Sequence, residues 1–351
     1  MSGKKKTLFV SDIHLGAGNS WDWFDAKLEG PKLINFFQYV KNRHAKQKDI
    51  KEVVLLGDVF DLWVCPHNVK PHTFEQIIRH HAAVVNGIKE MAAAVPTLYV
   101  NGNHDYQVTS QNISDAFEGK IRHIGNVYRR GNVLAEHGHQ YALFNRPDAK
   151  NGGPHLRLPL GYYITRLHTT LENSRGSKAK MIFQAIDESF QIMGAEKLPE
   201  SVLDALKDAV EMPPKPKKVE KFTMGHICPD QQYDEVRERY RNLFDDWKDA
   251  VGFWQSIQMI MSELNRLGTV ADRLCRDGVD IVIFGHSHDT KMDKDTLFVK
   301  DRIYANCGYW CGFGDKDKAD DNAHFVETDG KTVILNYLVN GTAREDSVLE
   351  L

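Results

Sequence analysis

The sequence has no apolar run long enough to cross a membrane. A transmembrane helix needs about 20 consecutive apolar residues, and no stretch of the 351-residue chain approaches that length. The apolar run near the N-terminus, residues 7–10, is also too short for the core of a signal peptide. We therefore expect a soluble, cytoplasmic protein with no transmembrane segment.

The chain also lacks paired cysteines and a strong net charge. Its five cysteines are scattered and contain no CxxC pair, which argues against a disulfide framework and against a structural zinc site. A net charge of −3 gives no global basic field, so long nucleic acid is not an expected partner. We expect reduced thiols, and the charge alone does not name the substrate.

What the chain does have is an alternation of β-rich and helical patterns in its first third. Strands are predicted at 8–10, 53–56 and 98–100, with helices at about 31–47 and 73–94 between them. This order is typical of βαβ units, in which helices cover a parallel or mixed sheet. The fold class is therefore predicted to be α/β.

The pattern changes in the middle of the chain and then returns. Residues 141–269 read as helices with a Pro- and Lys-rich break, and are predicted to form a helical cap inserted into the core. The core is predicted to comprise residues 1–140 and 270–351. The runs "RIYANCG", "AHFVETDG" and "KTVILNYLV" suggest a closing antiparallel set of strands.

Five predicted strands end in side chains that can bind metals. The segments are "FVSDIHLG", "LLGDVF", "YVNGNHD", "AEHGH" and "IFGHSH". In open α/β sheets, ligands bind beyond the carboxyl ends of the strands, so these residues should converge in space. They are Asp12, His14, Asp58, Asn103, His104, Asp105, His137, His139, His286 and His288.

Each of these segments alone is more often a turn, but five in order predict a metal site. Carboxylate, amide and imidazole ligands without thiolate suit Mn²⁺, Fe or Zn²⁺. The set is too large for one ion and fits two ions that share a carboxylate. We therefore predict two divalent metal ions as cofactors, with Mn²⁺ as the first choice.

The ordered motifs D-x-H, G-D-x-x-D, G-N-H-D, H-G-H and G-H-x-H resemble the calcineurin-like metallophosphoesterase superfamily. This resemblance implies a β sandwich of two mixed sheets flanked by helices, with a dinuclear metal centre at the strand ends. It also implies a role for each matching residue in this sequence. The first metal would be held by Asp12, His14 and His288, the second by Asn103, His137 and His286, with Asp58 between them.

The resemblance further implies a metal-dependent phosphoric ester hydrolase that cleaves a phosphodiester or pyrophosphate through a metal-bridging hydroxide. His104 would contact the phosphate or protonate the leaving group, and Asp105 would orient His104. The substrate would be a small phosphorylated molecule, with nucleotide-linked and lipid-linked compounds both open.

Two segments, "GDVFDLW" and "RIYANCGYW", resemble the branch that includes UDP-2,3-diacylglucosamine hydrolase, an enzyme of lipid A synthesis. A lipid A enzyme of that kind is therefore the first alternative. The chain departs from that branch in having His104 where an arginine is usual and in having a much longer insertion. Trp63 and Trp310, within these segments, are more simply read as core residues.

Three arginines early in the insertion, Arg146, Arg157 and Arg166, are candidates to bind a second phosphate, because a guanidinium group matches phosphate oxygens as a fork. Plain surface arginines are an equal reading. Two alternatives of other kinds are a scaffold of the same fold that binds a protein partner, and a nuclease. The complete ligand set argues against the scaffold, and the absence of a basic, aromatic surface pattern argues against the nuclease.

Overall fold

The structure is a computed structural model that divides the chain into two compact units. It describes residues 5–66, 69–142, 145–146, 158–175, 238, 241, 267–275, 278–294, 301–312 and 323–351. The first unit comprises Met1–Leu62, His72–His139 and Asn265–Leu351. The second unit comprises Trp63–Pro71 and Gln140–Leu264.

Within the described residues, the first unit contains two mixed sheets. The larger sheet has seven strands, ordered β12-β11-β10-β1-β2-β3-β4. Strands β1 to β4 run parallel, and β10 pairs antiparallel with β1. The bounds are β1 (Lys6–Val10), β2 (Ile50–Leu56), β3 (Thr97–Val100), β4 (Ile121–His123), β10 (His324–Thr328), β11 (Thr332–Val339) and β12 (Thr342–Glu350).

The smaller sheet has five strands, ordered β5-β6-β7-β9-β8. Its three central strands are parallel, and β5 and β8 pair antiparallel at the two edges. The bounds are β5 (Val127–Arg130), β6 (Val133–Glu136), β7 (Ile281–Phe284), β8 (Lys291–Lys294) and β9 (Ile303–Asn306). The predicted pair of mixed sheets is confirmed.

The hydrophobic core lies between the two sheets, as expected when each sheet buries one face against the other. Phe9 and Val54 come from the larger sheet, and Ile283 and Ala305 come from the smaller one. All four side chains are fully buried. This packing fixes the positions of the strand ends of the two sheets relative to one another.

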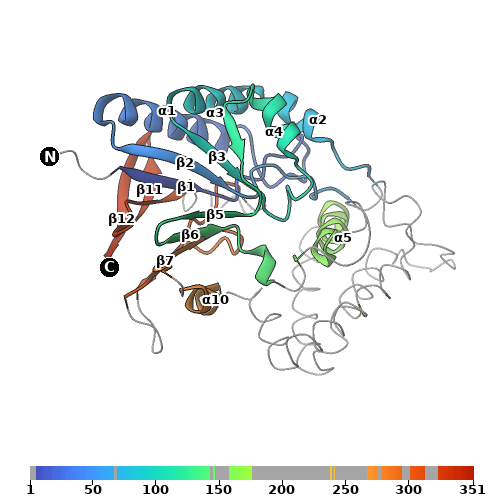
Figure 1. Cartoon of the computed structure of the whole chain (residues 1–351). Helices are drawn as coiled ribbons and strands as arrows, with labels where there is room; N and C mark the ends of the chain where they lie inside the picture. The colour runs from blue at the N-terminus through green and yellow to red at the C-terminus, as the bar shows by residue number, and fades with distance from the viewer. Residues whose placement is uncertain are drawn as a thin grey trace, which may run out of the picture. The chain divides into compact units, whose positions relative to one another are not determined.

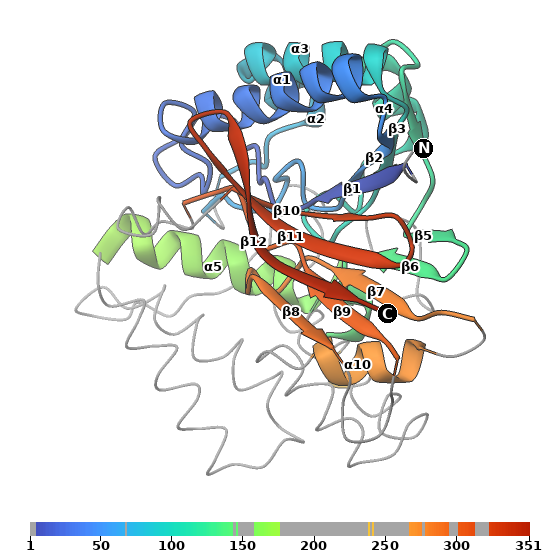
Figure 2. The same cartoon turned by 90° about the vertical axis from the view of Figure 1, so that its left-hand side faces the viewer.

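Helices cover the outer faces of the sandwich. In Figures 1 and 2, α1 (Glu29–Gln47) and α3 (Ala82–Ala94) lie side by side over the larger sheet. Helix α10 (Leu267–Leu274) packs against β7 of the smaller sheet. The predicted helix at 73–94 is two helices, α2 (Phe74–His80) and α3, because the backbone leaves the helical region at His81.

The remaining helices of the first unit are short. Helix α4 (Ser110–Phe117) follows β3, and a 3-10 turn, η1 (His139–Tyr141), begins at the last residue of the segment His72–His139. Thr109 caps α4 by accepting a hydrogen bond from the Asn112 backbone, a local signal that ends the loop after β3.

One predicted strand is present but lies in a different sheet from the one expected. The run "RIYAN" forms β9 in the smaller sheet, parallel to β7, and is not part of the closing antiparallel set. All four residues of β9 are buried, which is typical of a central parallel strand. The closing set instead gains β12, whose polar sequence and exposed edge position give no alternating apolar signal.

The second unit is described mainly by α5 (Leu160–Arg175) and by residues 63–66 and 69–71. Trp63 is fully buried and packs edge-on against Tyr162, with ring centroids 5.9 Å apart. Among the described residues, no helix combines the length and the apolar composition that crossing a membrane requires.

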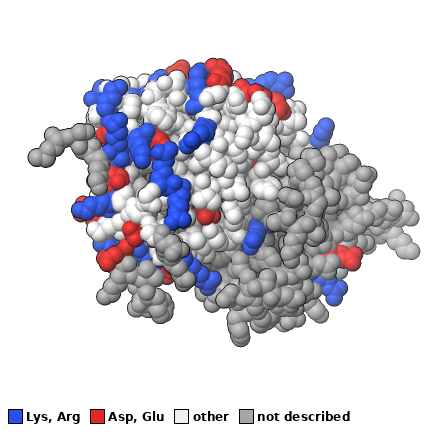
Figure 3. All heavy atoms as spheres, viewed as in Figure 1, with Lys and Arg blue, Asp and Glu red and all other residues white. Residues whose placement is uncertain are grey.

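Charges of both signs share the surface that Figure 3 presents. Basic side chains gather over the region where β2 and β5 lie in Figure 1, with acidic ones beside them. Exposed basic residues of these strands include Lys51, Arg129 and Arg130. Arg130 pairs with Glu52 at 3.1 Å, so part of this basic charge is neutralised locally.

Candidate metal centre

The predicted ligands converge at the carboxyl ends of strands from both sheets. Asp12, Asp58 and Asn103 follow the adjacent strands β1, β2 and β3, and are at most 2% exposed. His137 follows β6 and is fully buried, and the histidines at 286 and 288 follow the neighbouring β7 and are half-buried. Residues more than 250 positions apart thus share one site.

Five of these residues hold an unusual backbone conformation. Asp12, His14, Asp58, His286 and His288 all have φ between 51° and 67°. L-residues other than glycine rarely adopt this left-handed region, and such strain clusters at functional sites. The strand ends are bent sharply enough to turn each of these side chains, and that bend costs stability.

Two glycines allow the loops to approach closely. A Cβ atom on Gly102 would collide with the Asp58 carboxylate, and one on Gly285 would collide with the Asp12 carboxylate. No other residue fits at either position without moving these acids. The glycines of G-N-H-D and G-H-x-H therefore serve close packing around the site.

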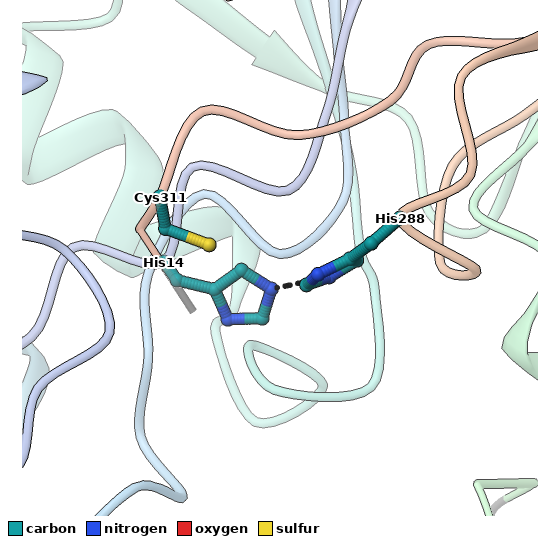
Figure 4. Close-up of side chains that lie close together, drawn as sticks. All are labelled: His14, His288 and Cys311. Carbon is teal, nitrogen blue, oxygen red and sulfur yellow. Dashed lines mark hydrogen bonds between the residues drawn. The ribbon is translucent and has the colours of Figure 1, made fainter. Parts of the chain in front are cut away.

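The first group of side chains is Asp12, His14 and His288. Nε2 of His14 lies 3.2 Å from Nε2 of His288, and Figure 4 shows the two rings facing each other. Oδ1 of Asp12 lies 3.1 Å from Nε2 of His288 and 3.8 Å from Nε2 of His14. Three atoms that can bind a metal ion thus lie within 3.8 Å of one another.

The second group adjoins the first through Asp58. Oδ2 of Asp58 lies 3.0 Å from Nε2 of His137 and 3.8 Å from Nε2 of His14, so one carboxylate faces both groups. Donor atoms of Asp58, His137 and His286 lie within 4.8 Å of one another. His137 Nδ1 lies 3.0 Å from the Leu56 carbonyl, which leaves Nε2 directed at Asp58.

The structure changes the expected partner of His104. Nδ1 of His104 lies 3.1 Å from Oδ2 of Asp61, whereas Asp105 was expected to orient this ring. Asp105 accepts hydrogen bonds from the backbone N–H groups of Val59 and Gly102 and from the Tyr99 hydroxyl. Asp105 thus holds the loops around Asp58, because its carboxylate faces the backbone.

Asp61 is the residue that sequence reasoning missed. Its Oδ2 lies 3.0 Å from Nδ1 of His14 as well as against His104, so one buried carboxylate fixes two rings. The signal was present, since Asp61 is the second aspartate of G-D-x-x-D. Such a carboxylate behind a histidine fixes its tautomer and its orientation.

The buried charges balance one another. Burial alone would raise the pKa of Asp12, but the His137 and His288 charges outweigh it and hold that pKa well below its usual range. The pKa of Asp58 is likewise lowered, against burial, by His137 and His104. For His137, burial acts downward, yet Asp58 and Asp12 raise its pKa to about 9. The acids in this site require positive charge beside them.

The donor set fits divalent cations. Carboxylates and imidazoles with fixed orientations are the ligands of Mn²⁺, Fe and Zn²⁺, and the buried acids gain a positive partner when a cation binds. Asp12, His14 and His288 face one position, and Asp58, His137 and His286 face the other. Asn103 is buried at the same strand end.

The three arginines have different outcomes. Arg157 lies outside the described residues, and Arg146 is exposed. Arg166 is 1% exposed and donates to the Tyr162 hydroxyl and to the carbonyls of Pro66 and Val69. A guanidinium group held this way anchors backbone, so the structure favours a structural role for Arg166 over the predicted phosphate contact.

An aromatic side chain borders the site. The Trp23 ring lies 4.9 Å from the His14 ring and 5.1 Å from the His104 ring, measured between centroids. Trp23 also lines a pocket of about 550 Å³ together with His80 and Glu29. Its segment, 18–28, has no regular pattern of apolar residues, and nothing in the sequence singles Trp23 out.

Comparisons with known proteins agree with this geometry. The family model for calcineurin-like phosphoesterases matches residues 5–290. A UDP-2,3-diacylglucosamine hydrolase from Shewanella frigidimarina (strain NCIMB 400) is 25% identical over 107 residues, which are 30% of this chain and 36% of that protein. The chain thus spans about a third of the length of this curated relative.

The solved structure of GAP50, the anchor in the inner membrane complex of Plasmodium, is 11% identical, with a TM-score of 0.35. The match covers 99% of this chain and 88% of that one. The family match covers strands β1 to β7 and every strand end of the site, and the chain belongs to the calcineurin-like phosphoesterase family.

Proposed function

We propose that the protein is a metal-dependent hydrolase of phosphodiester or pyrophosphate bonds. The observation that carries this proposal is the position of Asp58, whose Oδ2 faces His14 of one ligand group and His137 of the other. In this proposal Asp12, His14 and His288 would hold the first cation. Asn103, His137 and His286 would hold the second, and Asp58 would be shared between them.

When bound, two such cations supply Lewis-acid charge for the phosphate oxygens and lower the pKa of a water molecule. The residues supply position and protons. His104 would donate a proton or a hydrogen bond to the phosphate or the leaving group, and Asp61 would hold the ring in place. The backbone N–H of His104 donates a hydrogen bond to Asp58 at 2.8 Å, so the proposed proton donor and the proposed shared metal ligand are held in a fixed relative position.

The metal and the substrate class also belong to the proposal. Mn²⁺ suits the oxygen and nitrogen ligands of the site. The named relative acts, by its name, on a UDP-linked diacylglucosamine, so nucleotide diphosphates linked to a lipid are the first natural substrates to test. We propose residues 141–269 as a cap that selects the substrate.

The test is hydrolysis of an aryl phosphodiester beside the matching monoester, using metal-stripped full-length protein with Mn²⁺ added back. We expect metal-dependent cleavage of the diester, and loss of that cleavage in Asp58→Ala. Asp115→Ala, which removes an exposed carboxylate of α4, is the matched control. Failure to cleave either ester or a UDP-linked lipid, with two metals bound, would contradict the proposal.

A further inference from the structure

Cys311 is fixed in place beside the first ligand group. It is fully buried and takes part in no disulfide. The backbone N–H before it, of Trp310, donates to the Asp12 carbonyl at 2.9 Å, and the one after it, of Gly312, donates to the Trp23 carbonyl at 3.0 Å. Hydrogen bonds on both sides thus position this thiol.

The thiol completes a group of three potential metal ligands. Its Sγ and one ring nitrogen each of His14 and His288 lie within 4.8 Å of one another. Figure 4 shows the sulfur directed toward the two imidazoles, whose facing nitrogens are 3.2 Å apart. Asp12 closes the same space from a further side. Two imidazoles, a carboxylate and a thiol are enough for a four-coordinate site.

We propose that Cys311 is a thiolate ligand of the cation held by His14 and His288. This inference rests on the proposed metal site, and it adds a sulfur ligand to the first position and so changes which metal that position prefers. Coordination replaces the S–H bond by a sulfur–metal bond, and the proton leaves to solvent. A soft thiolate favours Zn²⁺ over Mn²⁺. The first position therefore takes a softer cation than the second, whose candidate ligands among the described residues offer oxygen and nitrogen atoms.

Cobalt substitution and X-ray absorption test the proposal on the full-length protein. Co²⁺ bound to the metal-free wild type should give a near-ultraviolet thiolate-to-cobalt band. Cys311→Ser should lose the band, and Cys275→Ser, which changes a half-buried cysteine outside the group, should keep it. Cys311→Ser should also weaken Zn²⁺ binding about tenfold or more, with a smaller change for Mn²⁺.

The zinc absorption edge of the wild type gives an answer that needs no variant. With Zn²⁺ bound, we expect a sulfur shell at about 2.3 Å. Bound zinc without that shell, or a cobalt band that persists in Cys311→Ser, would overturn the role of Cys311 and leave the proposed hydrolase intact. A chain that binds neither metal would overturn both.

Discussion

Oδ2 of Asp61 lies 3.1 Å from Nδ1 of His104, inside the buried part of the site. The same oxygen lies 3.0 Å from Nδ1 of His14. One carboxylate therefore sets the direction of a proposed metal ligand and of the proposed proton donor. The two rings meet edge to face, with centroids 4.6 Å apart.

Asp61→Asn should lower kcat while leaving KM nearly unchanged. The amide keeps the size of the side chain but removes the charge that orients both rings, and such supporting residues are worth about 10–100-fold. The measurement is steady-state diester hydrolysis at saturating metal, so that weaker metal binding through His14 does not mask the effect. A kcat equal to that of the wild type would show that Asp61 orients neither ring.

His104→Ala and Asp58→Ala should separate chemistry from metal binding. In the proposed mechanism His104 contacts the substrate, so its loss should lower turnover about 100-fold or more while two metals stay bound. Asp58→Ala removes the carboxylate shared by both groups and should empty both positions. Metal content after dialysis measures the difference. Metal loss from His104→Ala, or two metals retained in Asp58→Ala, would contradict these roles.

The sequence was enough to predict that these strand-end side chains meet, for a physical reason. Parallel strands end at one edge of a sheet, so polar ligand residues directly after strands, such as Asp12 and Asp58, are predicted to meet. The position of a strand end does not give the direction of a carboxylate within the loop that follows. The resemblance implied Asp105 as the residue that orients His104, whereas Asp61 is the carboxylate that lies against this ring.

Other features depend on contacts that no local pattern encodes. Cys311 lies in the site because two backbone hydrogen bonds link its neighbours to the loops of Asp12 and Trp23. The residue type and the position of Arg166 predicted a phosphate contact. Its partners are instead carbonyl groups of residues about 100 positions earlier. Long-range contacts of this kind follow from the fold.

Arg166→Met should destabilise the second unit without weakening substrate binding. The change leaves the Pro66 and Val69 carbonyls without their buried donor, at about 1–3 kcal/mol for each group left unsatisfied. Hydrogen exchange should therefore become faster at 63–71, with KM for the diester unchanged. Lys70→Met, at an exposed position of the same unit, should change neither exchange nor stability. A raised KM with unchanged exchange would restore the phosphate contact.

Glu29→Gln should alter how stability depends on pH. Burial, the largest cause, raises the pKa of Glu29 from its usual value near 4.5 to about 7, although the Asp25 backbone N–H donates to the carboxylate at 2.6 Å. The folded chain then holds a proton that the unfolded chain releases between these values. This contribution to stability is present below pH 4.5 and is lost as pH rises through 7.

Glutamine keeps the acceptor for Asp25 and cannot ionise. The unfolding free energy of Glu29→Gln minus that of the wild type should be larger at pH 8 than at pH 4.5. The increase should be up to ~3 kcal/mol, at about 1.4 kcal/mol per pKa unit. Urea unfolding of the metal-free protein at both pH values measures this. Glu75→Gln, at an exposed site of α2, should show no such gain. A difference between Glu29→Gln and wild type that does not vary with pH would contradict the prediction.

The central claim is that two cations, shared through Asp58, support phosphoester hydrolysis. The most direct measurement is diester hydrolysis during titration of the metal-free protein with a divalent metal, with the bound metal counted at each step. We predict that turnover rises until two equivalents are bound and then stays constant, and that Asp58→Ala never reaches it. Full turnover at one equivalent, or no turnover with two equivalents bound, would contradict the account.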